Sequence, residues 1–203
     1  MIRIFQRNKL IGLFLGMALL TGCAMPINQH NARNYANSGF EAVQSDDWKF
    51  ARRQWGRAVY NADLGFMDKR ERAVYYYEYG RTLGVTCAFE EAEEYLSKAY
   101  ELDLQTGGPV FMSLVELSRL NLDQKKYQEA VDYFKKALSE LEEVNAPEKS
   151  PTDFSELLKE YAIALNGIGR LEDAREIEEK SALYENSGQE SVTERTPYGL
   201  HCN

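Results

Sequence analysis

The chain of 203 residues has few of the residues from which catalytic and metal sites are usually built, with two histidines and three cysteines. His30 and His201 lie near the two ends, outside any predicted core element that could hold a base in position. The sequence contains no glycine-rich phosphate loop, no zinc-type cluster and no nucleophile elbow. These absences predict a protein that is not an enzyme and that binds no cofactor and no metal.

Positive charge is also scarce. The chain has 24 Lys and Arg against 32 Asp and Glu, a formal net charge of -8. Proteins that bind nucleic acid need a basic footprint to neutralise phosphates, so we expect no nucleic-acid partner. Adjacent glutamates, as in Glu90-Glu91 and Glu93-Glu94, are typical of a solvated helix face rather than of an acid–base site.

The apolar run at 10–20 is too short to cross a bilayer comfortably, because a spanning helix takes about 20 apolar residues. It follows Arg3, Arg7 and Lys9 and leads into Leu20-Thr21-Gly22-Cys23. A basic, then apolar, then small-residue order is the pattern of a secretory signal peptide. The four residues that end in Cys23 resemble the lipobox of bacterial lipoproteins.

That resemblance implies that residues 1–22 are removed and that Cys23 becomes a lipidated N-terminus carrying acyl chains such as palmitate. Two or more chains hold a protein stably on a membrane, whereas a single chain binds only marginally. Ala24 and Met25 stand where lipoproteins retained in the inner membrane carry Asp, which favours the outer membrane and a periplasm-facing chain. The alternative is an ordinary cleaved leader followed by a cysteine that lies there by chance.

Four segments repeat one spacing of large and small residues. A large residue is followed by a small one three positions later, a large one after four more and a small one after a further three. The segments are Trp48–Ala58, Phe89–Ala99, Tyr127–Ala137 and Leu171–Ser181. Steps of three and four place each set on one helical face, where small residues let a neighbouring helix approach closely. In the fourth segment Glu178 and Ser181 replace the usual residues, which suits a polar terminal helix.

A second helical stretch precedes each segment, and two of these hold a glycine nine residues before the first aromatic, at Gly39 and Gly80. This helix–turn–helix unit resembles the tetratricopeptide repeat (TPR), whose period is about 34 residues. The resemblance implies an all-α fold. We expect a short α-solenoid of about four irregular units and eight helices, over residues 32–184.

The repeat is irregular, because successive segments begin 41, 38 and 44 residues apart. The extra residues fall at the chain breakers Asp63-Leu64-Gly65, Thr106–Pro109 and Asn145–Asp153. Within the last of these, Ser150-Pro151 is typical of an N-cap followed by proline in the first helical position. The predicted organisation is therefore a leader (1–22), a linker (23–31), the solenoid (32–184) and a flexible C-terminal tail (185–203).

In the TPR family the first helix of each unit lines a groove that binds partners. By that resemblance the inward-facing residues are Asn37, Phe40, Val43, Tyr77, Arg81, Val115, Arg119 and Ile163. Of the tyrosines at 75, 76, 77 and 79, we expect Tyr76 and Tyr79 to pack in the core and Tyr77 to be exposed, since three consecutive residues cannot share one helical face.

Arg81 and Arg119 occupy matching places in neighbouring units. Together they could bind a carboxylate or an acidic peptide through their forked donors. The alternative is that Glu78 and Glu116, each three residues earlier on the same helix, already pair with them.

Once Cys23 is assigned to the lipid, Cys87 and Cys202 remain, and two cysteines in an oxidising compartment suggest a disulfide. The alternative is a buried Cys87 and a free thiol in the tail. If the bridge forms, the tail could cover part of the groove and regulate access to it.

These observations predict a lipid-anchored scaffold or adaptor that faces the periplasm and binds envelope proteins through its groove. The pairing of a lipobox with TPR-like units resembles pilotins, which deliver secretin subunits for type IV pili. It also resembles envelope adaptors. A subunit of a β-barrel assembly or secretion machine is a further alternative.

Overall fold

The computed structural model describes residues 25–185 and 195–202. The expected leader and its lipidated Cys23 lie outside these residues. In the described part of the chain, no helix is both long and apolar enough to cross a membrane.

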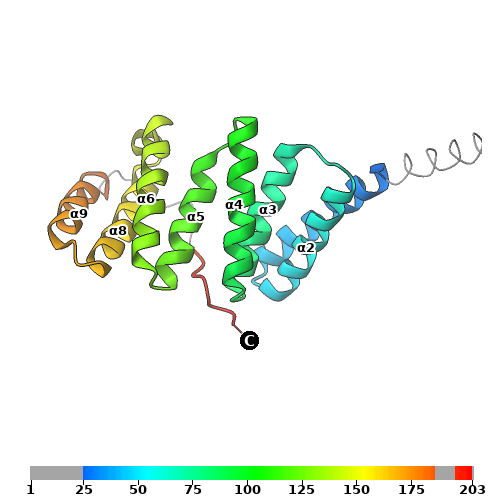
Figure 1. Cartoon of the computed structure of the whole chain (residues 1–203), viewed down its shortest axis with the longest axis horizontal. Helices are drawn as coiled ribbons and strands as arrows, with labels where there is room; N and C mark the ends of the chain where they lie inside the picture. Colours follow the sequence, from blue (N-terminus) through cyan, green and yellow to red (C-terminus); the bar gives the residue numbers. More distant parts are fainter. Residues whose placement is uncertain (1–24, 186–194, 203) are drawn as a thin grey trace, which may run out of the picture.

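Nine helices, arranged as four antiparallel pairs and one short extra helix, make up the described part of the chain (Figure 1). An N-terminal helix covers residues 25–44. It is followed by α2 (Trp48–Leu64), α3 (Lys69–Val85), α4 (Phe89–Thr106), α5 (Val110–Asp123), α6 (Tyr127–Glu143), α7 (Ala146–Lys149), α8 (Pro151–Gly167) and α9 (Leu171–Glu185). The expected all-α solenoid is confirmed, and α7 is the helix that the sequence did not predict.

The repeated segments begin the second helix of each pair. Trp48, Phe89, Tyr127 and Leu171 are the first residues of α2, α4, α6 and α9. The small residues of the pattern, such as Ala51, Ala92, Ala130 and Ala174, are buried. Because one helix face carries both the large and the small members, this face packs against the first helix of the unit and forms the core.

The turn inside each unit has the same backbone in all four units. The residue two positions before the second helix has a positive φ, at Asp46, Cys87, Lys125 and Gly169. In the second unit the Cys87 N–H donates to the carbonyl of Gly84 and the Ala88 N–H to that of Leu83, and the other units repeat both bonds. This is the Schellman arrangement, which satisfies the last carbonyls of a helix.

The predicted linker at 23–31 is wrong for residues 25–31, which form the beginning of the N-terminal helix. This end of the helix is held by a contact that the sequence does not reveal. The Gln29 amide Nε2 donates to the carbonyl of Gly65, in the turn between α2 and α3, over 2.8 Å. This bond ties the beginning of the N-terminal helix to the end of α2, the second helix of the same unit. The first unit therefore includes residues 25–31, ahead of the residue at which the sequence pattern places its start.

The predicted flexible tail is wrong for residues 195–202, which we call the C-terminal strap. The strap lies against α3 and α5 and ends at the red C-terminus in Figure 1. The N–H groups of Gly199 and His201 donate to the carbonyls of Gly84 and Val85, at the end of α3. The Gly84 carbonyl also accepts the N–H of Cys87 in the turn, so the strap adds a second bond there. The Val85 carbonyl is one of the last-turn carbonyls that a helix leaves without an N–H partner, and the strap supplies one.

Candidate functional site

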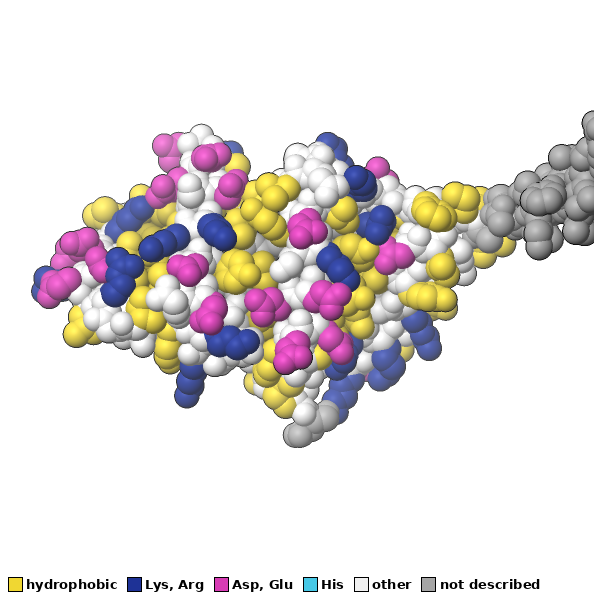
Figure 2. Space-filling view, viewed as in Figure 1, with side chains coloured by type: hydrophobic (Ala, Val, Ile, Leu, Met, Phe, Trp, Pro, Cys, Tyr) yellow, Lys and Arg dark blue, Asp and Glu magenta, His cyan; other side chains and the backbone are white. Residues whose placement is uncertain are grey.

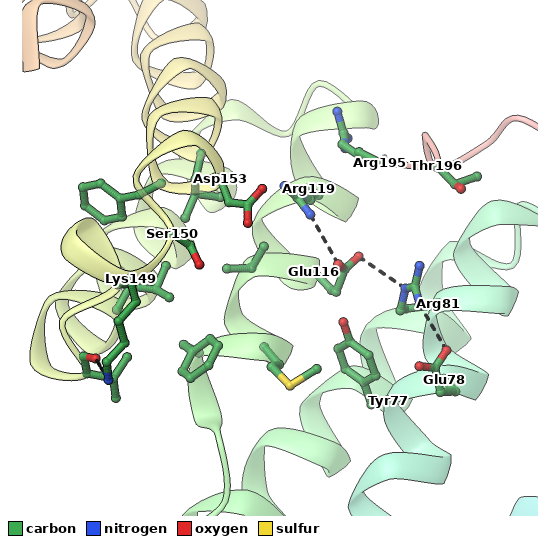
Figure 3. A pocket seen from close by; sticks show the side chains of 18 residues that line it. Tyr77, Glu78, Arg81, Glu116, Arg119, Lys149, Ser150, Asp153, Arg195 and Thr196 are labelled. Atoms are coloured by element: carbon green, nitrogen blue, oxygen red, sulfur yellow. Dashed lines mark hydrogen bonds and ion pairs between the residues drawn. The ribbon is translucent and has the colours of Figure 1, made fainter. Parts of the chain in front are cut away.

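A cavity of about 710 Å³ lies between α3, α5, α7, α8 and the C-terminal strap, and we call it the groove cavity (Figure 3). One wall is largely apolar and is made by Phe111, Met112, Val115, Leu141, Val144, Phe154 and Leu157, with the polar Lys149, Ser150 and Asp153 beside them. The other wall is polar and is made by Tyr77, Glu78, Arg81, Glu116, Arg119, Arg195 and Thr196. A cavity with an apolar side and a few fixed polar groups is the usual form of a binding site.

Local sequence explains how α5 supplies both walls. Met112, Val115, Glu116 and Arg119 are spaced by three, one and three residues, so they follow one another along a single helix face. The inserted helix α7 closes the apolar end, because Ala146 and Lys149 line the cavity there. The Lys149 ammonium donates to the carbonyl of Val144 over 2.7 Å, so α7 is tied to the end of α6.

Four side chains of the polar wall, Glu78, Arg81, Glu116 and Arg119, form a row of alternating charge with Glu160 of α8, which we call the charge ladder. An Arg81 nitrogen lies 3.1 Å from a Glu78 oxygen and another lies 3.9 Å from Glu116. Arg119 lies 3.5 Å from Glu116 and 2.8 Å from Glu160 (the first three pairs are drawn in Figure 3). The Arg81–Glu78 pair lies within α3 and the Arg119–Glu116 pair lies within α5. The other two pairs join α3 to α5 and α5 to α8.

Burial and neighbouring charge act together on the ladder. Burial raises the pKa of the Glu78 carboxyl above its usual range, and nearby Arg81 only partly opposes this. Burial alone would lower the pKa of the Arg119 guanidinium, but Glu160 and Glu116 outweigh it and the pKa is raised. Burial also raises the pKa of the Tyr77 phenol, so this hydroxyl stays protonated at neutral pH.

The ladder decides between the two interpretations of the matched arginines. Arg81 and Arg119 are each within 4 Å of two carboxylates, Arg81 of Glu78 and Glu116, Arg119 of Glu116 and Glu160. The pairing with Glu78 and Glu116 is therefore present, and Glu160 adds a partner from another unit. Since both guanidinium groups already have partners, the structure supports this pairing and not the alternative in which the two arginines bind a carboxylate.

Four of the eight expected groove residues meet at the groove cavity. Tyr77, Arg81, Val115 and Arg119 line it. Asn37, Phe40 and Ile163 are exposed and do not line it, and Val43 packs against the core. Phe111, Met112 and the residues of α7 could not be predicted as site residues, because the apolar wall depends on where the insertion after α6 folds.

The tyrosines of α3 are more buried than expected. Tyr76 is buried as predicted, and Tyr79 packs against the core with its ring centroid 4.7 Å from that of Tyr95. Tyr75 is also buried, against Trp55. The expected exposure of Tyr77 is wrong, because it is only partly exposed, packs against the core and carries Arg81 over its ring, with 5.8 Å from guanidinium carbon to ring centroid.

The C-terminal strap reaches the groove cavity and is fastened covalently. Cys87 and Cys202 form a disulfide with their Cα atoms 5.1 Å apart. Arg195 and Thr196 line the cavity at the other end of the strap (Figure 3). Between these ends Tyr198 is only 7% exposed. A single tyrosine in a polar tail gave no sequence signal for this burial.

Structure comparison gives the family resemblance at the level of the fold. BtubC from P. vanneervenii matches with a TM-score of 0.71 at 14% identity, over 81% of this chain and 68% of that chain. The TPR-like repeats of a putative kinesin light chain from Podosopora anserina match with a TM-score of 0.61 at 16% identity, over 93% and 95%. The fold is that of TPR-like repeat proteins.

Another structural neighbour is larger than this chain. Aspartyl phosphate phosphatase F from Bacillus subtilis has a TM-score of 0.64 at 17% identity, and the match covers 83% of this chain but only 43% of that chain. No family model and no curated protein sequence matches this chain. At these identities the likeness shows the fold alone, and one fold can serve many functions, so function has to be argued from the site.

The groove cavity offers an apolar and a polar binding surface. Among residues 25–185 and 195–202, no group of three or more His, Cys, Asp or Glu side chains is placed to hold a metal ion. On the face shown in Figure 2, basic and acidic side chains are interspersed over the middle of the molecule, and several basic side chains gather at its lower right edge.

Proposed function

We propose that this protein is a lipid-anchored scaffold on the periplasmic face of the outer membrane, which binds a protein of the cell-envelope machinery in its groove cavity. The observation that carries the proposal is the cavity itself, with an apolar wall and a preformed charge ladder on a TPR-like solenoid. Apolar contacts supply most binding energy, whereas fixed charges select the register of the bound segment.

The membrane part of the proposal is supported by the sequence of residues 1–25. Its lipobox-like Leu20-Thr21-Gly22-Cys23 ends only a few residues before the N-terminal helix. A lipid on Cys23 would hold the N-terminal end of the solenoid at the membrane. The groove cavity, built by α3 to α8, would then hold its partner near the membrane surface.

The test is affinity purification of the full chain from crosslinked envelopes of its own organism, followed by mass spectrometry. Met112→Asp combined with Val144→Asp should remove the partner, because both side chains line the groove cavity and are already 39% and 42% exposed. The matched control is Leu104→Asp with Leu183→Asp, which adds the same charge at exposed positions outside the cavity. Cys23→Ala should release the chain from the membrane fraction.

The identity of the partner separates the alternatives. A secretin subunit would indicate a pilotin-type factor, and a barrel-assembly or secretion component would indicate a subunit of such a machine. An enzyme of the cell wall or a protease would indicate an adaptor. A partner that is retained equally by the cavity variant and its control would exclude the groove cavity as the binding site.

A further inference from the structure

The C-terminal strap is held in the way that a bound peptide is held, in a slot formed by Gly84, Glu116, Asp123 and Glu160, which we call the strap slot. The Tyr198 ring lies directly on Gly84, since a β-carbon there would be only 2.3 Å from the ring. Its hydroxyl donates to Glu116 over 2.5 Å, and its backbone N–H donates to Asp123 over 2.8 Å. An aromatic anchor with polar contacts at both ends is a common mode of peptide recognition.

Asp123 is the clearest sign that this slot is built for an occupant. Its side chain is only 18% exposed. Among the described residues, the two groups that donate hydrogen bonds to the Asp123 carboxylate both belong to the strap. They are the guanidinium of Arg195 and the backbone N–H of Tyr198. Arg195 also lies 3.6 Å from Glu160. Without the strap, a largely buried carboxylate would lose its partners, which is costly unless another cation replaces them.

The charge of the empty slot indicates what would fit it. Without the strap, the slot and the adjoining charge ladder together hold four carboxylates and two guanidinium groups, a formal charge of -2. The carboxylates are those of Glu78, Glu116, Asp123 and Glu160, and the guanidinium groups are those of Arg81 and Arg119. The strap adds one guanidinium. The slot therefore favours a cationic segment, which is opposite to the acidic peptide that the arginine pair alone would suggest.

We propose that the strap slot is a binding site for a partner segment with an arginine three residues before a tyrosine, and that the chain's own strap occupies it while the Cys87–Cys202 disulfide is closed. This proposal rests on the proposed scaffold function and specifies the chemistry of the partner and the control of access. The strap supplies the template, since Arg195 and Tyr198 are three residues apart and make the contacts described above.

The disulfide is placed where it can be opened. Cys202 is exposed, and a small cavity of about 310 Å³ beside it is lined by Lys49, Arg52, Arg53 and His201. A dithiol reductant would attack the Cys87 sulfur, and Cys202 would leave as a thiolate beside Lys49, Arg52 and Arg53. The dithiol is oxidised to its own disulfide, and the two electrons and two protons it gives up leave two thiols on the chain. Cations beside a sulfur favour its thiolate form and speed its departure.

The experiment measures binding of a fluorescent peptide, Arg-Thr-Pro-Tyr-Gly-Leu, to the full chain in detergent by fluorescence anisotropy. Opening the disulfide alone would leave the strap tethered next to its slot at a high effective concentration. The unlocked protein is therefore the variant with Tyr198→Ala and Cys202→Ser, which removes both the anchor and the lock. We expect it to bind the peptide at least about tenfold more tightly than the oxidised wild type.

Two controls tie binding to the slot. In the unlocked protein Asp123→Asn should weaken binding by about tenfold, because a charge-assisted contact is lost. Asp132→Asn, a matched change on an exposed residue of α6, should leave it unchanged. A control peptide with glutamate for arginine and alanine for tyrosine should not bind. Circular dichroism checks folding. If the unlocked variant does not fold, Arg195→Ala in dithiothreitol carries the same comparison, because it removes the other anchor of the strap and opens the disulfide.

The proposal is overturned if the control peptide binds as well as the arginine–tyrosine peptide, or if the oxidised wild type binds as tightly as the unlocked protein. A failure here leaves the proposed function open to its own test. If the envelope partner is still lost in the Met112 and Val144 variant while the peptide does not bind, the scaffold stands and only the strap slot falls. If no partner is captured but the peptide binds, the strap slot is supported as a binding site and the proposed scaffold function is not.

Discussion

At the scale of single residues, small side chains decide which segments touch. A β-carbon at Gly39 would lie 2.8 Å from the Trp55 side chain, and one at Gly80 would lie 2.8 Å from Leu96. Gly84 plays the same part for the Tyr198 ring of the strap. Because these contacts are closer than a β-carbon allows, each glycine is required by its neighbour and not by its own backbone angles.

We therefore expect Gly84→Ala to displace the strap. Overpacking of this kind costs about 1–3 kcal/mol in the free energy of unfolding. Urea unfolding measures the loss, and protease cleavage after residue 185 reports release of the strap. The same substitution made with Tyr198→Ala should cost much less, since the ring is gone and alanine favours the helix by about 1 kcal/mol. Equal losses in both backgrounds would show that the Tyr198 ring is not the cause.

Glu78 should make the free energy of unfolding depend on pH. Its pKa is raised by burial above the ordinary 4.5. As pH rises above 4.5, the unfolded chain loses this proton before the folded chain does, so stability falls until the pH passes the folded-state pKa. The contribution is favourable below the unfolded pKa and is lost above the folded one.

Glu78→Gln removes this titration while it keeps the shape of the side chain. We expect the stability of the variant relative to wild type to increase as the pH is raised from 4 to 8. Unfolding in urea at a series of pH values measures it. Glu90→Gln, on the exposed face of α4, is the control and should show no such trend. A constant difference between Glu78→Gln and wild type would contradict the expected burial cost.

At the scale of elements, the four units share a turn rather than only a pair of helices. Each turn places one residue at positive φ, and only the last unit uses glycine there. Asp46, Cys87 and Lys125 accept a backbone that is unfavourable for residues with a β-carbon. The two Schellman bonds of each turn offset this cost, so the turn geometry is kept even where its usual residue is missing.

Lys125→Gly should therefore stabilise the protein. Glycine removes the cost of the left-handed backbone, but it also raises the entropy of the unfolded chain. The net gain in the free energy of unfolding is about 0.5–1 kcal/mol. Thermal or urea unfolding measures the gain. Lys126→Gly is the matched control, since the neighbouring lysine has φ of -82 and should lose stability instead. A loss in both variants would mean that the Lys125 side chain contributes contacts of its own.

At the scale of the whole molecule, the strap joins parts that a solenoid otherwise leaves independent. In the solenoid, units pack mainly against their neighbours, in three core clusters along the chain. The strap returns from beyond α9 to α3 and α5, and Tyr198 belongs to the core cluster that includes Leu83 and Leu117. The disulfide closes this return over a separation of 115 residues.

We expect reduction of the Cys87–Cys202 disulfide to lower the free energy of unfolding by about 2–4 kcal/mol. The bridge restricts the unfolded chain, and the strap's contacts with α3 weaken once it is free. Urea unfolding with and without dithiothreitol measures the change. Cys202→Ser should resemble the reduced protein and should be insensitive to the reductant. No difference between the oxidised and reduced wild type would mean that the strap contributes nothing to stability.

Much of the fold could be predicted because its signals are local. The spacing from Trp48 to Ala58 and from Tyr127 to Ala137 depends only on helix geometry, and the structure begins α2 and α6 at those first residues. Half of the expected groove residues also meet at the cavity. The ion pairs of the charge ladder could not all be predicted, because Arg119 pairs with Glu160, which lies 41 residues later in the neighbouring unit.

The sequence by itself determined the helical units and the turns between them, since periodicity and chain breakers act over a few residues. Only the tertiary structure decided that the insertion after α6 becomes α7 and a cavity wall. It alone placed Tyr198 on Gly84 and Arg195 at Asp123, because these contacts join residues more than 70 positions apart. Such contacts depend on where whole helices lie, and no local pattern encodes that.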